Sequence, residues 1–479
     1  MYDDDHPKHF CAVFGIYGTN DAAAHTALGL HALQHRGQEG TGIVSWDGKD
    51  FYAHRALGHV ADAYSNKETM KRLVGHAAVG HNRYSTTGAP MLRNVQPLFA
   101  EIATGGISVA HNGNLTNART LRKELIRAGS IFQSTTDTEI LVHLLATGEG
   151  PFEDRLVSAL QRVQGAYALV MMTKDGLIGA RDPVGIRPLM IGKLADGVHI
   201  LASETVALDI VGATFVREVK AGEIIIINGD GIRSIQPAPD HPARLCIFEH
   251  VYFSRPDSFM NGQSVYQVRK NIGAELAKES PADVDMVVPV PDSGNPAALG
   301  YAQESGIPFE FGIIRNHYVG RTFIEPQDHI RHLGVKLKHN ANRMMLKGKK
   351  VVLVDDSIVR GTTSVKIVEM VREAGATEVH MRVASPPIKH PCYYGIDMAT
   401  EEELLANRMT IEEMKAHIGV DSLAFVTIDG LYRAAGEPGR DPENPKYTDH
   451  YFTGDYPVPL IDKEGGAGKE QLSLLQDLG

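Results

Sequence analysis

The run VVLVDDSIVRGTTS at residues 351–364 constrains the fold more than any other part of the sequence. Its continuous apolar start is typical of a parallel strand that is buried on both faces of a sheet. The residues that follow, 362–374, carry valines at helical spacing, and Gly375 is a typical helix stop. The run therefore predicts a strand, a polar loop and a helix, in that order.

The polar loop of this run is suited to a phosphate group. In an open α/β sheet, ligands bind beyond the carboxyl ends of the strands, where a helix N-terminus offers free N–H groups. Gly361 would let the backbone approach the ligand closely, because it has no Cβ. The two aspartates could accept hydrogen bonds from neighbouring ribose hydroxyls and help to organise Mg²⁺. We predict that the site consists of Asp355, Asp356, Ser357, Ile358, Val359, Arg360, Gly361, Thr362 and Thr363.

Two further segments fit the same site. The run VPVPDSG at 288–294 ends an apolar strand in a turn suited to pyrophosphate oxygens and Mg²⁺, with Ser293 as the expected contact. The run RNHYVGRTFIEP at 315–326 places Arg315 and Arg321 around a glycine, as a cationic lid over pyrophosphate would. Together these runs resemble the phosphoribosyl pyrophosphate (PRPP) motif of type I phosphoribosyltransferases. If only the two aspartates or only the Gly-Thr-Thr run were present, the alternative interpretation would be preferred: a strand–turn–helix corner with solvated aspartates and no ligand. The complete 351–364 motif favours a PRPP site. A dinucleotide site is a competing use of this architecture, but no GxGxxG run follows a strand here.

The pattern of predicted elements changes near residues 235–244. Before this point, short β-type runs outnumber helices, which indicates an α+β domain with packed antiparallel sheets. The expected strands are 11–17, 42–46, 77–81, 107–110, 167–173 and 223–227, and the expected helices are 22–34 and 137–146. After it, strands alternate with helices, which indicates an α/β domain. Its expected strands are 286–290, 309–314, 351–354 and 378–383, and Thr410 with Glu413 predicts a capping box.

Cys11 opens the first of these strands, where a cysteine is usually no more than a small buried apolar residue. Four runs that follow it in the sequence favour a catalytic role instead: HALQHRGQEGTG (31–42), HNRYSTTG (81–88), HNGNLTN (111–117) and STTDTE (134–139). They occur in the order seen in class II glutamine amidotransferases, and the first half resembles their N-terminal-nucleophile domain, an αββα sandwich. The resemblance implies that residues 1–10 are a propeptide. Its removal would free the α-amine of Cys11 to act as general base for the thiol.

The same resemblance implies a role for each matching residue. Cys11 would be the nucleophile, and Asn112 with the N–H of Gly113 would form the oxyanion hole. Arg83 would grip the α-carboxylate of glutamine in a bidentate pair, and Asp137 would hold its α-ammonium. Two further residues, Arg36 and Thr86, would support the glutamine pocket.

The whole chain resembles the glutamine phosphoribosylpyrophosphate amidotransferase family, also through FSRPDS (253–258), YVGRTFI (318–324) and SPPIKHPCYYGID (385–397). The resemblance implies ammonia release from glutamine, internal ammonia transfer and displacement of pyrophosphate from PRPP with Mg²⁺, as the first step of de novo purine biosynthesis. It also implies a homodimer or homotetramer that purine nucleotides inhibit. We predict a propeptide (1–10), a glutaminase domain (11–240), a phosphoribosyltransferase domain (241–435) and an irregular C-terminal segment (436–479).

Composition limits the partners and the cofactors. A formal net charge of −10 argues against general affinity for nucleic acid or an anionic membrane, and three cysteines exclude a disulfide framework and fit a cytoplasmic enzyme. Some family members hold a [4Fe–4S] cluster on four cysteines. Here Cys246 and Cys392 stand where two ligands are expected, but 443–457 has no cysteine, and His450 is a poor substitute. We predict no iron–sulfur cluster and two ordinary buried thiols.

Two other functions are compatible with parts of the sequence. One is a glutaminase whose second domain only regulates it, which the intact 355–363 loop disfavours. The other is a protein without enzymatic activity that senses PRPP or a nucleotide, which the set of Cys11, Arg83, Asn112 and Asp137 disfavours.

Overall fold

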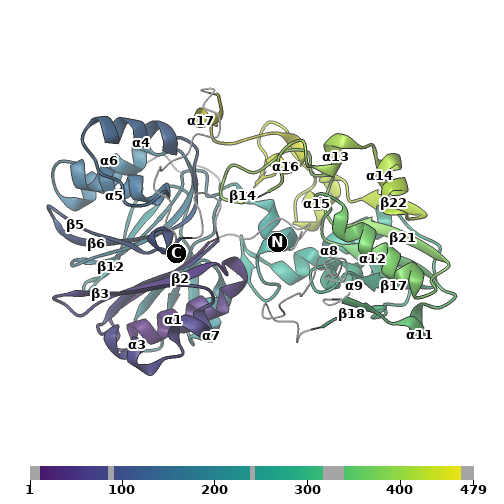
Figure 1. Ribbon diagram of the computed structural model, residues 1–479, viewed down its shortest axis with the longest axis horizontal. Coiled ribbons are helices and arrows are strands. Elements are labelled where there is room, and N and C mark those ends of the chain that lie inside the picture. Colours follow the sequence, from purple (N-terminus) through teal and green to yellow (C-terminus); the bar gives the residue numbers. More distant parts are fainter. Residues whose placement is uncertain (1–10, 85–90, 238–242, 317–338, 397, 465–479) are drawn as a thin grey trace, which may run out of the picture.

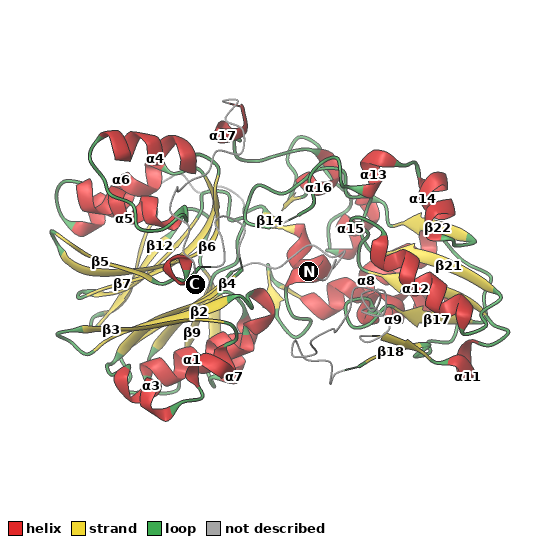
Figure 2. Ribbon diagram, in the orientation of Figure 1, coloured by secondary structure: helices red, strands yellow, loops and turns green. Residues whose placement is uncertain are grey.

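The structure, a computed structural model, describes residues 11–84, 91–237, 243–316, 339–396 and 398–464. Its elements form two domains, which follow one another along the chain (Figure 1). In the first domain, two sheets face each other and helices cover both outer sides (Figure 2). In the second, helices flank a single main sheet.

The first domain consists of two antiparallel sheets. One has the strand order β11 (Thr214–Glu218), β9 (Met190–Lys193), β10 (His199–Ala202), β1 (Ala12–Tyr17), β4 (Ala77–Arg83), β2 (Gly40–Trp46) and β3 (Phe51–Leu57). The other has the order β13 (Gly231–Ile235), β12 (Ile224–Asn228), β8 (Gly176–Arg181), β7 (Gly165–Thr173), β6 (Gly105–Leu115) and β5 (Leu98–Ile102). The helices beside the first sheet are α1 (Ala22–Ala32), α2 (Val60–Tyr64), α3 (Lys67–Arg72) and α7 (Thr205–Ile210). Those beside the second are α4 (Ala118–Arg127), α5 (Thr138–Thr147) and α6 (Phe152–Arg162). The predicted αββα sandwich is confirmed.

Apolar side chains fill the space between the two sheets. Val13, Val44 and Val79 come from one sheet, and Val170 and Ile225 come from the other; all five are fully buried. Because successive side chains of a strand point to opposite faces, the alternate residues of these strands face the helices.

Two aspartates that precede helices do not cap them. Asp21 lies at the N-cap position of α1, and Asp137 at that of α5, but neither side chain makes a capping hydrogen bond. The helix predicted over 22–34 ends at Ala32, and the 3₁₀ turn η1 (Gln34–Arg36) follows it. The carboxylate of Asp137 is therefore available to the site described below.

The second domain has a parallel sheet with the order β17 (Met286–Pro289), β20 (Lys350–Asp355), β21 (Glu378–Val383) and β22 (Ser422–Phe425). Val351 and Leu353 belong to the core beneath α12 (Thr362–Glu373) and α14 (Ile411–Ile418). Val352 and Val354 belong to the core on the other face, with α8 (Val265–Glu279) and α9 (Asn295–Ser305). Both faces of β20 are thus buried, as the sequence predicts. The capping box of Thr410 and Glu413 is present at the start of α14.

The strand predicted over 309–314 is interrupted. Phe309 makes a single parallel bridge to Val287 of β17, and the N–H of Gly312 then bonds to the carbonyl oxygen of Glu310 at 2.9 Å. This tight turn ends the pairing with the main sheet. The chain continues as β18 (Ile313–Arg315), which pairs instead with β19 (His339–Ala341).

The described part of the C-terminal segment, 436–464, contains only short elements between irregular stretches, but it is packed against the rest of the protein. β23 (Tyr447–Thr448) pairs in parallel with β14 (Leu245–Cys246), and α16 (His450–Thr453) follows with Tyr451 fully buried. Buried tyrosines supply the apolar area that the glycines and prolines of this segment lack. Farther on, α17 (Ile461–Glu464) lies against the first domain, where the Asp462 carboxylate accepts a hydrogen bond from the N–H of Arg119 at 2.7 Å.

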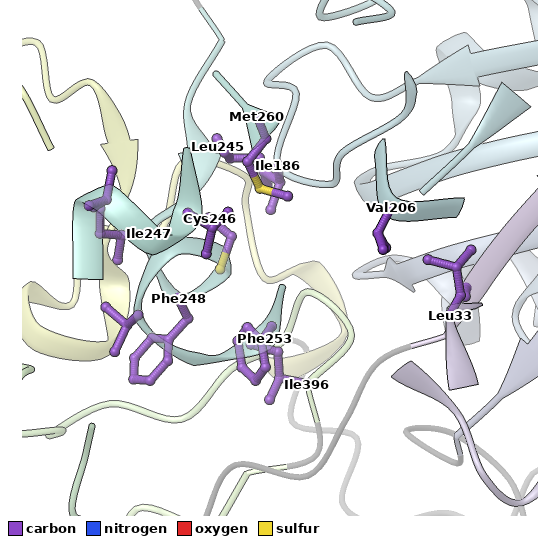
Figure 3. Close-up of a cluster of buried hydrophobic side chains, with 14 of the residues drawn as sticks. Leu33, Ile186, Val206, Leu245, Cys246, Ile247, Phe248, Phe253, Met260 and Ile396 are labelled. Atoms are coloured by element: carbon purple, nitrogen blue, oxygen red, sulfur yellow. The ribbon is translucent and has the colours of Figure 1, made fainter. Parts of the chain in front are cut away.

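The two domains share one continuous core. Figure 3 shows residues of the first domain within the same buried cluster as residues of the second: Leu33, Ile186 and Val206 from the former, and Leu245, Phe248, Phe253 and Ile396 from the latter. The predicted boundary, near residue 240, falls between β13 and β14. Within the described ranges, no helix has the length and hydropathy that a bilayer crossing requires.

Candidate active sites

Cys11 and Arg83 lie at the same end of two paired strands. Ala12 of β1 is opposite Asn82 of β4, so the residues just beyond this pair, Cys11 and Arg83, are neighbours across the ladder. The Cys11 thiol donates to the carbonyl oxygen of Tyr84 over 3.6 Å. Burial raises the pKa of this thiol to about 11, and the nearby Arg83 charge offsets the effect only in part.

Arg83 is a buried cation that faces anionic groups. Its guanidinium Nη1 lies 3.8 Å from Oε2 of Glu39, a residue within the quoted 31–42 run for which we predicted no role. Burial lowers the pKa of Arg83, and the charges of Cys11, Glu39 and Asp137 act against that shift. A buried guanidinium in this position is suited to a carboxylate, which it can bind through two N–H groups.

Asp137 is oriented by groups outside its own helix. Its Oδ2 accepts the N–H of Leu115 at 2.9 Å, and its Oδ1 lies 3.6 Å from Nδ1 of His111. Burial acts to raise the pKa of Asp137, but His111 and the backbone N–H groups of Leu115 and Thr138 outweigh it and hold the pKa below its usual value. An ionised carboxylate is thus favoured close to Cys11. His111 belongs to the HNGNLTN run, but we predicted no role for it, because nothing in that run distinguishes it from a buried structural histidine.

Asn112 and Gly113 lie side by side on β6. Asn112 is fully buried, and both polar atoms of its side chain lack a hydrogen-bond partner among the described residues. Such buried groups are costly unless a ligand satisfies them, so they indicate a site. Gly113 has φ +146°, and a Cβ there would lie 2.0 Å from the carbonyl oxygen of Ala166. The position accepts only glycine.

Arg36 has partners at the junction of the domains. Its guanidinium donates to Glu204 of the first domain, to Oε2 of Glu249 at 2.5 Å and to Oγ of Ser254 at 3.1 Å. Glu249 and Ser254 belong to the second domain, so the described bonds of Arg36 join the two halves of the molecule. The predicted support of the glutamine pocket by Arg36 stays a prediction, and these bonds add a role at the domain junction. Thr86, the other predicted support, lies outside the described residues.

The predicted phosphate loops are neighbours at the carboxyl ends of β17 and β20. The N–H of Val290 bonds to the carbonyl oxygen of Val354 at 2.9 Å. A Cβ on Gly294 would lie 2.4 Å from that same oxygen, so the two loops could not approach so closely with any other residue there. Loop 290–294 and loop 356–361 are therefore adjacent at this edge of the sheet, as a shared site requires.

The residues of the second loop divide into two groups. Asp355, Asp356 and Ser357 are buried, and the Ser357 hydroxyl donates to Oδ2 of Asp356 at 2.6 Å. The side chains of Ile358 and Val359 belong to the hydrophobic cores, so only their main chain can contact a ligand.

The end of this loop leads into α12. The Arg360 guanidinium lies 3.3 Å from Oε2 of Glu403. Gly361 has φ +82° and precedes Thr362 and Thr363, the first two residues of the helix. The N-terminus of α12 therefore lies directly at the end of loop 356–361.

Loop 290–294 carries a carboxylate, on Asp292, and a hydroxyl, on Ser293, and a cation lies beside it. The Arg315 guanidinium, at the end of β18, pairs with the carboxylate of Asp292 beside Ser293. Arg321 lies outside the described residues. Within those residues, no cluster of three or more His, Cys, Asp or Glu side chains could enclose a metal ion. A Mg²⁺ site does not require such a cluster, because proteins hold this ion through one or two carboxylates while substrate phosphates and water supply the other oxygens.

Cys246 and Cys392 lie on either side of one tyrosine. The Tyr451 hydroxyl is 3.2 Å from the Cys246 sulfur and 3.5 Å from the Cys392 sulfur. Burial raises the pKa of Cys246 to about 12. Cys392 is only partly buried, which differs from our expectation. The Tyr451 hydroxyl lies between the two sulfurs, and the sequence has only one further cysteine, Cys11, so these residues do not fit a Cys₄ cluster.

Comparisons with known proteins agree with both halves of the chain. Residues 81–209 match a family described as glutamine amidotransferase domain, and residues 259–394 match one described as phosphoribosyl transferase domain. An amidophosphoribosyltransferase of Rhizobium etli is 60% identical over 484 residues, which cover 100% of this chain and 97% of that protein. The Bacillus subtilis protein of the same name is 48% identical and covers 94% of this chain. A solved structure, glutamine PRPP amidotransferase from B. subtilis complexed with ADP and GMP, has a TM-score of 0.89 at 47% identity and covers 94% of this chain and 98% of that chain.

Proposed function

The chain belongs to the amidophosphoribosyltransferase family, and from this premise we propose how its residues divide the reaction between two sites. The protein is a glutamine-dependent PRPP transferase of purine biosynthesis. Glutamine, PRPP and water give 5-phosphoribosylamine, glutamate and pyrophosphate. The observation that carries the assignment is that one chain combines the Cys11, Arg83 and Asp137 cluster with paired loops at the carboxyl ends of β17 and β20.

The first site releases ammonia from glutamine. Arg83 binds the α-carboxylate, and Asp137, whose lowered pKa favours the carboxylate, binds the α-ammonium. The Cys11 sulfur attacks the amide carbon, while Asn112 Nδ2 and the N–H of Gly113 stabilise the oxyanion. Ammonia leaves, and water hydrolyses the thioester to glutamate. Support for these roles comes from the buried, unsatisfied amide of Asn112 and from the glycine-only position next to it.

A free α-amine on Cys11 is part of this proposal. The high pKa of the thiol means that a base must remove its proton, and an N-terminal amine with a pKa of about 8 can do so near neutral pH. Residues 1–10 would have to be removed first.

The second site transfers ammonia to the ribose. Asp355 and Asp356 hold the ribose hydroxyls, and the N–H groups and hydroxyls of residues 357–363 hold the 5-phosphate. Ser293 and Arg315 face the pyrophosphate, which ammonia displaces from the anomeric carbon with inversion. Bound Mg²⁺ would neutralise the departing pyrophosphate, with Asp355, Asp356 and Ser293 nearby. We further propose a cytoplasmic homo-oligomer that purine nucleotides inhibit; the B. subtilis relative was solved with ADP and GMP.

The proposal is tested by pyrophosphate release from PRPP and Mg²⁺, measured in parallel with glutamine and with ammonium. The wild-type protein should use both donors. Cys11→Ala should lose glutamine-dependent release and keep most of the ammonium-dependent release, because the second site has its own residues. Loss of both activities in a folded Cys11→Ala protein would contradict independent sites. Unchanged pyrophosphate release in Asp355→Asn would reject the ribose assignment.

A further inference from the structure

A short segment of the second domain touches the oxyanion glycine of the first. Gly395 has φ +103°, and a Cβ there would lie 2.7 Å from the carbonyl carbon of Gly113 and 3.0 Å from its Cα. The two main chains are therefore in direct contact. Gly113 also faces the carbonyl oxygen of Ala166 in β7. Its main chain is therefore packed between Gly395 and Ala166.

Two side chains of the first domain hold this segment in place. Asn114, next to the oxyanion glycine, donates from Nδ2 to the carbonyl oxygen of Tyr393 at 2.9 Å. Arg187 donates to the carbonyl oxygen of Tyr394 from Nε at 3.0 Å and from Nη2 at 2.6 Å. Arg187 is fully buried and lies 3.5 Å from Oε1 of Glu249, so its orientation is fixed by an ion pair.

The segment is also anchored within the second domain. The Tyr394 hydroxyl donates to the carbonyl oxygen of Val458 at 2.7 Å and accepts the N–H of the same residue at 3.0 Å. Ile396 is buried in the cluster that both domains share (Figure 3). Toward the N-terminus, the same stretch of chain starts beside the ribose site, where the N–H of Ala384 bonds to the carbonyl oxygen of Asp355 at 2.8 Å.

We propose that Tyr393–Gly395 is a positioning segment for glutamine hydrolysis: by packing on Gly113 it fixes the peptide N–H that receives the oxyanion. The inference rests on the proposed oxyanion role of Gly113. An oxyanion donor acts only when its N–H lies within hydrogen-bond distance of the developing charge, so small shifts of its main chain reduce kcat. Substrate affinity depends on Arg83 and Asp137, which the segment does not contact in the described bonds. The first domain would thus need the second domain seated against it in order to turn over glutamine.

Two substitutions test the segment. Gly395→Ala introduces a Cβ against Gly113, and Asn114→Ala removes the bond to Tyr393 with no added atoms. Both should lower kcat for glutamine hydrolysis by about 10- to 100-fold, while KM for glutamine changes by about twofold at most. Ammonium-dependent pyrophosphate release should stay close to wild type. The matched control is Gly419→Ala, at φ +82° with no atom within 4 Å of the new Cβ, and it should keep both activities.

Three results would count against the inference. An unchanged kcat for glutamine in both variants would overturn it. An equal fall in glutamine- and ammonium-dependent rates in both variants would also overturn it, because the segment would then serve only the fold. Asn112→Ala separates this inference from the proposed function. If Asn112→Ala leaves kcat for glutamine unchanged, the oxyanion assignment itself is wrong, whatever the other variants do.

Discussion

Cys11, the proposed nucleophile, has surroundings that favour the protonated thiol. With a pKa of about 11, only about one thiol in a thousand would be ionised at pH 8. The cause is mainly burial, which disfavours the charged thiolate, and the nearby carboxylates of Asp137 and Glu39 act in the same direction. On the proposed mechanism, the thiol would therefore need a local base, because few Cys11 thiols ionise spontaneously near neutral pH.

This leads to a prediction about pH. In a variant that retains residues 1–10, alkylation of Cys11 by iodoacetamide should be slow at pH 7 and rise about tenfold per pH unit up to pH ~11, because a raised thiol pKa leaves the thiolate as the minor form until then. Peptide mass mapping would give the rate at this residue, with Cys11→Ala as the background. A rate that levels off below pH 9 would contradict the raised pKa.

At the residue scale, the order of the family's runs related residues that are far apart in the sequence, whereas contacts outside these runs could not be foreseen. Cys11, Arg83 and Asp137 come from three separate runs, and their family order was enough to assign them to one pocket, where the structure finds them as neighbours. Arg36 bonds to Glu204 and Glu249, which are 168 and 213 residues away. No spacing in the sequence relates an arginine to carboxylates at such distances, so its role at the domain junction could not be predicted.

At the scale of elements, the β20–loop–α12 unit depends on a glycine at its sharpest point. Gly361 has φ +82°, and a Cβ there would lie 2.7 Å from Cδ2 of Leu405. The conformation is unfavourable for any other residue, and a Cβ would also displace the Leu405 side chain. Leu405 in turn is fixed to the loop, because its N–H bonds to the carbonyl oxygen of Val359 at 2.9 Å.

Gly361→Ala should therefore displace the phosphate loop. We expect a loss of about 10- to 100-fold in kcat/KM for PRPP with ammonium as donor, because a loop shift misplaces several phosphate donors at once. Backbone strain should also lower the free energy of unfolding by about 1–3 kcal/mol. The control is Gly348→Ala, at φ +74° with open space around the new Cβ. Equal kcat/KM values in the two variants would show that the loop tolerates a side chain.

Element prediction succeeded where the apolar pattern was strong. The strand over 351–354 and the helix that follows were placed within one or two residues, because a run buried on both faces has few other interpretations. The strand predicted over 309–314 was less accurate, since the tight turn at Glu310–Gly312 is made by backbone bonds that the apolar pattern does not reveal.

At the scale of the whole molecule, the C-terminal segment returns to the first domain. Asp462 accepts the N–H of Arg119 at 2.7 Å, the N–H of Thr120 at 3.1 Å and the Thr120 hydroxyl at 2.8 Å. These donors lie in the first turn of α4, whose own N-cap residue, Asn117, provides no side-chain cap. A residue of the last described helix thus caps a helix of the first domain. Nothing in the spacing of the sequence relates these two positions.

Asp462→Ala should therefore destabilise α4. We expect a loss of about 0.5–2 kcal/mol in the free energy of unfolding, the usual cost of removing a helix N-cap. Asp462→Asn, which keeps one acceptor oxygen but loses the charge, should lie between it and the wild type. Hydrogen exchange over 118–127 and thermal unfolding would measure the effect, with the exposed Glu402→Ala as the control for loss of one negative charge. Unchanged exchange in α4 would refute the cap.

The contact between Gly395 and Gly113 also has a consequence during synthesis of the chain, because Gly113 is made long before Gly395. A ribosome adds roughly 5–20 residues per second, so the glutaminase half is complete about 8–30 s before Tyr393–Gly395 has been made. On our proposal, a nascent chain would hold Cys11 and its pocket but not the segment that positions the oxyanion donor. Glutamine hydrolysis would then begin only when the half that consumes the ammonia is in place, and the growing chain would release none into the cell.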